Sequence, residues 1–133
     1  TKVRREIHQL RESNAESVQE KLAILALQIC GARLARLEIA EFDIDSGLGL
    51  EITAMATELM RNSFAHSRGS EIEIELSQVE NHTYLEVRDN GEGGATLESS
   101  RLGLIGVKER TERLGGVFTF LSTSSGTRVA ITL

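Results

Sequence analysis

The sequence is organised around residues 88–94, RDNGEGG. They follow residues 84–87 (YLEV), whose alternating apolar and polar side chains predict a strand, so Asp89 stands at a strand end. Asn90-Gly91 is a strong turn dipeptide, and the glycines after it let backbone amides approach a ligand closely. An acid beside such a loop suits a nucleotide, because the acid can accept from a base amine while the loop borders the phosphates. An ordinary hairpin turn is the alternative.

Length and composition predict one globular domain. With 133 residues the chain is long enough to bury a hydrophobic core, and 40% hydrophobic and 26% charged residues are ordinary for a soluble domain. The net charge of −5 argues against a nucleic-acid duplex as partner, since duplex binders normally show a basic face. It leaves open an anionic ligand held by backbone amides, a helix terminus and a metal ion.

The cysteine content and the apolar runs bear on the compartment. Cys30 has no partner for an internal disulfide and lies in an apolar helical context, which favours a buried thiol in a reducing cytoplasm. The longest apolar run, around residues 22–29, is too short to span a bilayer. Because the chain begins at Thr1, we expect a domain from a longer parent protein, which could itself be membrane-anchored.

Periodicity predicts an α+β fold, a two-layer α/β sandwich with helices on one face of a mixed, mainly antiparallel sheet. Helices are predicted from apolar residues at helical spacing in 1–12, 15–33, 48–66 and 104–114. Strands are predicted from alternation in 37–44, 71–76, 83–88, 117–121 and 127–133, with the second and third forming a hairpin. Residues 94–102 lack periodicity and are predicted to be a loop.

The longest predicted helix carries a polar row. Glu58, Asn62 and His66 are spaced four residues apart, so they share one face. A carboxylate, an amide oxygen and an imidazole in line can hold a hydrated divalent ion and contact phosphates. Magnesium takes few protein oxygens, keeps several waters and completes its shell from phosphate. A solvated polar stripe is the alternative.

Two later segments add candidate ligand contacts. Gly103 and Gly106, with Leu104 between them, open a predicted helix whose free amides attract anions. Gly126-Thr127 begins the last predicted strand, where the Thr127 hydroxyl could bond the edge of a base. Taken singly, the first segment is a helix start with glycines for close packing, and the second is a hairpin turn.

The order and spacing of these segments resemble the nucleotide site of the GHKL, or Bergerat-fold, ATPases. Residues 103–110 (GLIGVKER), followed by residues 114–116 (LGG), look like the catalytic, ATP-binding domain of sensor histidine kinases. Residues 65–67 (AHS) fit the subgroup related to nitrate and membrane-fluidity sensors. The resemblance covers residues 3–133 and implies the Bergerat fold.

The resemblance implies a role for each position. Asn62 would coordinate the Mg²⁺ that bridges the ATP phosphates, and Glu58 would orient a metal-bound water or assist proton transfer. His66 would lie near the phosphates. Asp89 would accept from the adenine amine, and Thr127 would contact adenine directly or through water. The remaining residues would border the nucleotide or flank its lid: Gly91, Gly93, Gly103, Leu104 and Gly106.

The resemblance also implies a protein-histidine kinase that lacks its own acceptor. The γ-phosphoryl group would pass to a histidine on a separate dimerising helical hairpin and then to a response regulator. Residues 1–14 would be the connecting helix from that missing hairpin, and residues 15–133 the ATP-binding domain. His8 is expected in that connecting segment, with an acceptor role as the alternative, and His82 is expected to be solvated in a turn. The full-length protein would be a homodimer and the isolated domain a monomer.

Two other functions stay open. A GHKL serine kinase that acts as an anti-sigma factor would share the fold but would need a surface for a sigma factor. A degenerate domain would hold nucleotide, or none, and serve as a docking module. Every candidate nucleotide position carries a competent residue type, which disfavours the degenerate domain.

Overall fold

The computed structural model of the chain describes residues 17–66, 71–91 and 101–133. Within these residues, helices are interspersed with single strands and strand pairs along the chain. In order they are α2 (Val18–Cys30), the 3-10 helix η1 (Gly31–Arg33), β1 (Leu34–Ile39), α3 (Ser46–His66), β2 (Ile72–Val79), β3 (His82–Asp89), α4 (Arg101–Arg113), β4 (Val117–Thr123) and β5 (Gly126–Thr132).

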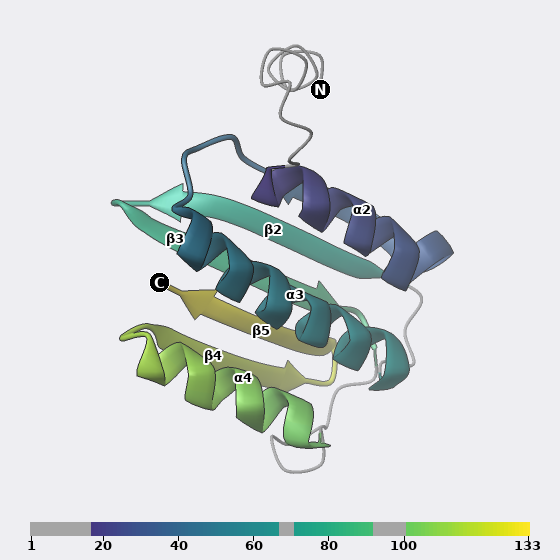
Figure 1. The fold of residues 1–133 in the computed structure, drawn as a ribbon. Helices are drawn as coiled ribbons and strands as arrows, with labels where there is room; N and C mark the ends of the chain where they lie inside the picture. The colour runs from purple at the N-terminus through teal and green to yellow at the C-terminus, as the bar shows by residue number, and fades with distance from the viewer. Residues whose placement is uncertain (1–16, 67–70, 92–100) are drawn as a thin grey trace.

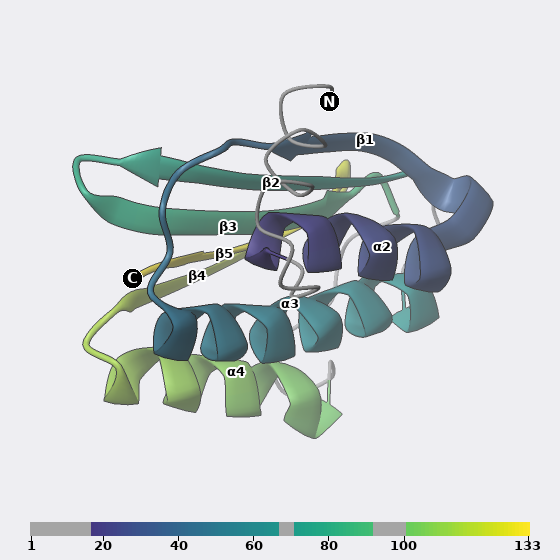
Figure 2. The ribbon, with the colours of Figure 1, turned by 45° about the horizontal axis from the view of Figure 1, so that its top comes forward.

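The strands form one five-stranded mixed sheet in the order β1-β2-β3-β5-β4. β1 and β2 are parallel, and every other neighbouring pair is antiparallel. Helices α2, α3 and α4 lie side by side on one face of the sheet (Figures 1 and 2). The predicted α+β class and the two-layer arrangement with a mainly antiparallel sheet are therefore confirmed.

The predicted hairpin of β2 and β3 is also confirmed. Its turn residues Glu80 and Asn81 have φ of 51° and 69°, the left-handed values that suit a tight two-residue turn between antiparallel strands. The register places Ile74 opposite Val87, both facing the helices, and Glu75 opposite Glu86 on the other face. Alternation thus determines which side of each strand meets the core.

The core lies between the sheet and the helix layer. It contains, among others, Leu22 and Ala26 of α2, Ile52, Met55 and Leu59 of α3, Leu104 and Val107 of α4, and Ile72, Leu85, Val129 and Ile131 of the sheet. Cys30 is 1% exposed, which confirms the predicted buried thiol, and burial raises the pKa of that thiol. No helix among the described residues is long and apolar enough to cross a membrane.

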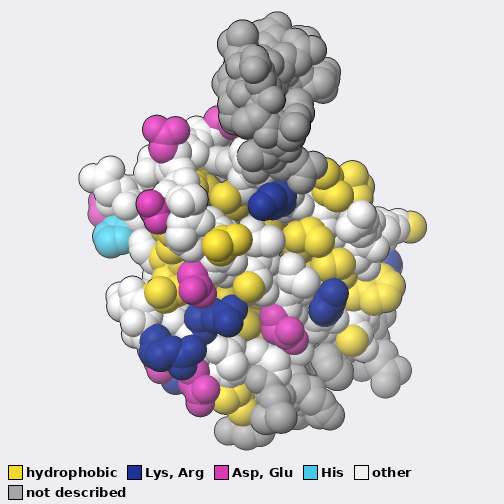
Figure 3. All heavy atoms as spheres, in the orientation of Figure 1, with side chains coloured by type: hydrophobic (Ala, Val, Ile, Leu, Met, Phe, Trp, Pro, Cys, Tyr) yellow, Lys and Arg dark blue, Asp and Glu magenta, His cyan; other side chains and the backbone are white. Residues whose placement is uncertain are grey.

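The outer surface of the helix layer mixes charged and hydrophobic side chains (Figure 3). Its exposed large hydrophobic residues are Ile24 and Leu27 of α2 and Leu50 and Phe64 of α3.

Several predicted element boundaries were wrong, and three elements differ most. The predicted strand 37–44 is β1, Leu34–Ile39, because pairing with β2 stops at Leu76. Phe42 and Ile44 continue the alternation only because they pack against the core from the connection to α3. The predicted helix 15–33 begins at Val18, where Ser17 caps it, and gives way to η1 at Gly31. Helix α4 begins at Arg101, so residues 101 and 102 are helical rather than part of the loop.

Residues 1–16, including the predicted first helix and His8, and residues 94–100 of the predicted loop lie outside the described part of the structure. His82 is exposed at the start of β3.

Candidate functional site

The candidate residues gather at one end of the sheet. β3 ends there at Asp89, β5 begins there at Gly126, and α3 runs toward the same end (Figure 1). The first turn of α4 also begins at this end, so residues far apart in sequence come together. The end of α3, the stretch at Asp89 and the Gly126-Thr127 pair therefore lie at the same end of the sheet as the start of α4.

Asp89 is held from two directions. Its Oδ2 accepts a hydrogen bond from Ser63 Oγ at 3.0 Å, and its Oδ1 accepts one from the Gly91 amide at 2.9 Å. The carboxylate is half-buried, and Ser63 is buried. Since each carboxylate oxygen has a further lone pair, Asp89 keeps the capacity to accept from a ligand. Sequence reasoning missed Ser63, although it directly follows Asn62.

Thr127 lies directly opposite Asp89 in the pairing of β3 and β5. Its hydroxyl is 3.2 Å from Ser122 Oγ of β4, a second serine that the sequence did not single out. Asp89 and Thr127 face the same side of the sheet, the side that the helices cover. A base edge placed there could meet an acceptor and a hydroxyl at once.

Gly126 explains how β5 comes so close to Asp89. A Cβ on Gly126 would lie 1.9 Å from the Asp89 carbonyl oxygen, and its φ is +141°, which L side chains rarely adopt. Only glycine satisfies both conditions without moving the backbone. The Gly126-Thr127 pair is therefore a structural requirement of this corner as well as a candidate ligand contact.

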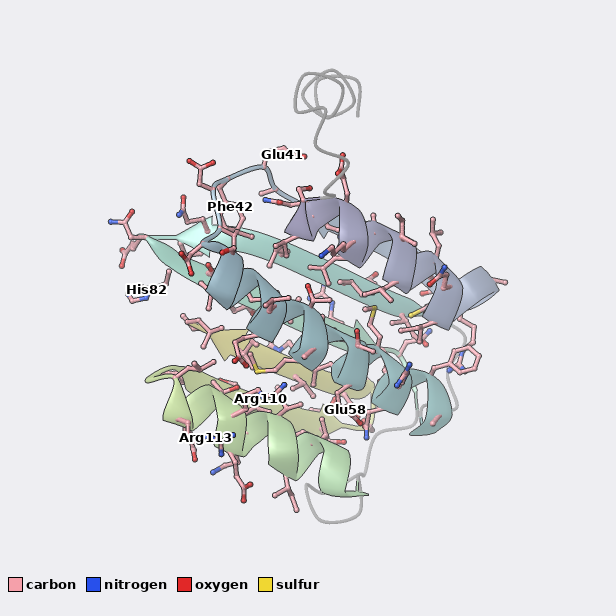
Figure 4. All side chains as sticks on the ribbon, viewed as in Figure 1. Glu41, Phe42, Glu58, His82, Arg110 and Arg113 are labelled. Atoms are coloured by element: carbon pink, nitrogen blue, oxygen red, sulfur yellow. The ribbon has the colours of Figure 1, made fainter. Side chains whose placement is uncertain are left out.

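Glu58 lies beneath the first turn of α4. Figure 4 shows it between α3 and α4, and a Cβ on Gly103 would be 2.3 Å from Glu58 Oε2. Gly103 is thus the residue that lets α4 approach the carboxylate. The positive end of the α4 helix dipole faces this negative charge, which is favourable.

The remaining described candidates on α3 and α4 are Asn62, Leu104 and Gly106. Asn62 is half-buried, one turn after Glu58 on the same face. The side chain of Leu104 is 1% exposed and belongs to the core, so a ligand could meet only its backbone. Gly106 is exposed, and a Cβ there would contact nothing within 4 Å. Because α4 begins at Arg101, Gly106 lies in the second turn of the helix rather than in its first.

Two candidates cannot be placed further. Gly93 and the side chain of His66 lie outside the described part of the structure, whereas Gly91 is described and buried. Within the described residues, no group of three or more His, Cys, Asp or Glu side chains is arranged to hold a metal ion.

Two hollows border Asp89 and overlap part of the candidate site. One, of about 280 Å³, is lined by residues of β3, β4 and β5, including Asp89, Gly126 and Thr127. The other, of about 190 Å³, is lined by Arg88, Asn90 and Ser125 among others. Neither is lined by residues of α3 or α4, so the hollows border the Asp89 and Thr127 part of the candidate site but not Glu58 or Asn62.

Known proteins resemble the chain in sequence and in fold. Residues 47–133 match the family described as histidine kinase-, DNA gyrase B-, and HSP90-like ATPase. The sensor protein VraS of Staphylococcus epidermidis is 30% identical over 97 residues, 71% of this chain and 28% of that protein. VraS of Staphylococcus aureus is 31% identical over 98 residues, with the same shares. The chain therefore spans little more than a quarter of the length of these relatives.

Solved structures share the fold. The histidine kinase domain of a blue-light activated histidine kinase from Erythrobacter litoralis superposes with a TM-score of 0.76 at 18% identity, covering 89% of this chain and 61% of that one. The Acinetobacter baumannii histidine kinase AdeS superposes with a TM-score of 0.67 at 21% identity, covering 87% and 61%.

Proposed function

The chain belongs to the family of histidine kinase-, DNA gyrase B- and HSP90-like ATPases, and from that membership we propose that it is the ATP-binding catalytic domain of a two-component sensor histidine kinase. The observation that carries the proposal is the junction of Asp89 with the last turns of α3 through Ser63. This hydrogen bond joins Asp89, which we propose binds the base, to the helix that carries Glu58 and Asn62. The relatives named sensor protein VraS support the kinase class.

Asp89 and Thr127 read adenine in this proposal. The Asp89 carboxylate, oriented by Ser63 and the Gly91 amide, accepts a hydrogen bond from the adenine 6-amine. Thr127, held by Ser122, contacts the base directly or through a water. A guanine carries a carbonyl in place of that amine, so its oxygen would face the carboxylate without a proton between them. The site should therefore favour ATP over GTP.

Asn62 and Glu58 serve the phosphate end. They offer an amide oxygen and a carboxylate on one helix face, the hard oxygen donors that Mg²⁺ prefers. When bound with ATP, Mg²⁺ supplies charge neutralisation on the phosphates. Asn62 would hold the ion, Glu58 would orient a water of its shell or accept a proton, and His66 would lie near the phosphates. Gly91, Gly93, Gly103, Leu104 and Gly106 would border the nucleotide with backbone atoms.

The chemistry is transfer of the γ-phosphoryl group to a histidine of another domain. Such transfer depends on orientation and charge neutralisation rather than on a protein nucleophile in this domain. The acceptor would lie on a dimerising helical hairpin of the same parent protein, which residues 1–14 would connect to the ATP domain of residues 15–133. A response regulator would then receive the group. We place the parent among the kinases related to nitrate and membrane-fluidity sensors, as a homodimer with this domain in the cytoplasm and a possible membrane anchor.

Nucleotide titration tests the assignment. Calorimetry with Mg²⁺ should show that the chain binds ATP more tightly than GTP. Asp89→Asn should weaken ATP binding and reduce the preference, and Asn62→Ala, which removes the oxygen ligand, should weaken the effect of Mg²⁺ on ATP binding. Equal affinity of the unmodified chain for ATP and GTP would contradict the base contact. An unchanged Mg²⁺ effect in Asn62→Ala would contradict the metal role.

The acceptor chemistry separates the proposed kinase from its alternatives. The parent protein should become labelled by γ-³²P-ATP, and the label should be lost in acid and kept in base, as expected for phosphohistidine. An acid-stable label on a partner protein would indicate a serine kinase instead. Nucleotide binding without any label, in the parent protein supplied with its response regulator, would indicate a docking module.

A further inference from the structure

Arg33 reaches from η1 to the last turns of α3. Its guanidinium Nη1 donates a hydrogen bond to the Phe64 carbonyl oxygen at 3.0 Å, and its Cζ lies 4.6 Å from the centre of the Phe64 ring. The two residues are 31 positions apart in sequence. Arg33 thus contacts both the backbone and the side chain of one residue on α3.

The contact between Arg33 and Phe64 lies in the last turn of α3. The last four carbonyls of an α-helix lack intrahelical donors, and Phe64 is two residues before the helix ends at His66. A cation beside these carbonyls also opposes the negative end of the helix dipole. Stacking of a guanidinium on an aromatic ring adds attraction and fixes the plane of the cation. Arg33 therefore stabilises the end of α3 in one orientation.

Asn62 directly precedes the two anchored positions, Ser63 and Phe64. Successive residues of an α-helix point about 100° apart, so side chains at 62, 63 and 64 point in three different directions. Ser63 is tied to the sheet through Asp89, and Phe64 is tied to η1 through Arg33. Two ties on different sides fix the rotation of this turn about the helix axis, and that rotation sets where the Asn62 amide points.

We propose that Arg33 is a positioning residue for the metal end of the nucleotide site, acting through Phe64 on Asn62. The inference rests on the proposed function, since it takes Asn62 as the metal ligand. The other end of α3 is held separately, because Asp45 Oδ2 accepts from the amides of Gly47 and Leu48. Loss of Arg33 therefore loosens the last turns of the helix and leaves its start in place.

The test measures ATP affinity of the chain by calorimetry, once with Mg²⁺ and once with EDTA. Arg33→Ala should weaken binding in Mg²⁺ by about tenfold, equivalent to about 1.4 kcal/mol. Binding in EDTA should change by less than about twofold, because the Ser63–Asp89 hydrogen bond keeps the base end in place. Arg33→Lys, which keeps the charge and one donor, should restore part of the Mg²⁺-dependent affinity.

The matched control is Arg36→Ala. Arg36 lies nearby on β1, and its ion pair with Glu38 is about half exposed on both sides, so its removal should change little. Phe64→Leu keeps the carbonyl acceptor and removes the ring, and should give a smaller loss than Arg33→Ala. Amide hydrogen exchange should quicken in the last turns of α3 in Arg33→Ala and stay unchanged in Arg36→Ala.

Each outcome has a definite reading. Equal weakening by Arg33→Ala in Mg²⁺ and in EDTA, or no weakening in either, overturns the inference. If Arg33→Ala does not fold, Arg33→Lys and Phe64→Leu decide on the same criterion. If Asn62→Ala removes the Mg²⁺ effect and the Arg33 variants keep it, the inference fails and the proposed function stands. If the unmodified chain binds ATP equally with Mg²⁺ and EDTA, the proposed metal role itself fails.

Discussion

Ser63 Oγ donates a hydrogen bond to Asp89 Oδ2 at 3.0 Å, and this bond joins the longest helix to the central strand of the sheet. Ser63 directly follows Asn62 in sequence. Asp89, proposed to bind the base, is therefore bonded to the direct neighbour of Asn62, proposed to hold the metal.

Ser63→Ala should weaken ATP binding by about three- to tenfold, because it removes one hydrogen bond that orients the Asp89 carboxylate. The loss should be the same with Mg²⁺ and with EDTA, since it concerns the base end, and the preference for ATP over GTP should fall. Calorimetry with both nucleotides measures each effect. Ser77→Ala is the control, because Ser77 bonds Glu75 on the face of the sheet away from the helices. Unchanged ATP affinity in Ser63→Ala would show that Asp89 needs no such support.

Gly103→Ala should impair phosphotransfer while the domain stays folded. The new Cβ would lie 2.3 Å from Glu58 Oε2, the end of a flexible side chain that can swing away. Moving a catalytic group by about 1 Å can reduce the rate by about 100-fold. The measurement is label transfer from γ-³²P-ATP in the parent protein, with urea denaturation of the chain as the test of folding.

Gly106→Ala tests whether alanine in place of a glycine of α4 by itself destabilises the domain. A Cβ at Gly106 meets nothing within 4 Å, so alanine should raise the free energy of unfolding by about 0.5–1 kcal/mol. If Gly103→Ala transfers phosphate at the normal rate, the close approach of α4 to Glu58 has no catalytic consequence.

The layers and the pairing could be predicted from sequence because alternation and helical spacing report directly which side of each element is buried. The rule failed at Phe42 and Ile44, which alternate like strand residues but pack against the core outside β1. Alternation shows burial, whereas a strand also requires pairing with a neighbour, and the chain stops pairing with β2 after Ile39, whose partner is Leu76.

The candidate site was predictable to a smaller extent. Asp89 stood out because a strand and a glycine turn flank it. Ser63 and Arg33 did not, because each acts on a residue 26 or 31 positions away, and no local pattern reports such a contact. Similarly, Gly103 looked like a residue that opens a helix, whereas the structure shows that it makes room for Glu58.

Gly126→Ala should destabilise the fold, in contrast to Gly103→Ala. The new Cβ would lie 1.9 Å from the backbone oxygen of Asp89, which cannot swing away, and φ of +141° is strained for alanine. We expect the free energy of unfolding to fall by about 3 kcal/mol or more, measured by urea denaturation. Ser125→Ala, at the exposed neighbouring position, should stay within about 0.5 kcal/mol of the unmodified chain. A small loss in Gly126→Ala would mean that β5 can shift away from Asp89.

Tyr84 provides a pH-dependent test of the sheet face opposite α2, α3 and α4. Burial, together with the hydrogen bond that its hydroxyl donates to Glu86 and the negative charge of Glu86, raises the pKa of Tyr84 to about 12. Glu86 is itself buried and paired with Arg88 at 2.9 Å. Because the folded state holds the phenol proton more tightly than the unfolded state does, this stabilisation is complete below pH of about 10 and is lost as pH rises through about 12.

Tyr84 is the chain's single tyrosine and there is no tryptophan, so phenolate absorbance reports this residue alone. In a rapid pH jump, read before unfolding, the midpoint should lie near pH 12 in the native chain. It should lie near pH of about 10 in denaturant. Glu86→Gln should lower the native midpoint, since it removes the charge that opposes the phenolate, and burial should keep it above the denatured value. A native midpoint equal to the denatured one would show that Tyr84 is neither desolvated nor bonded to Glu86.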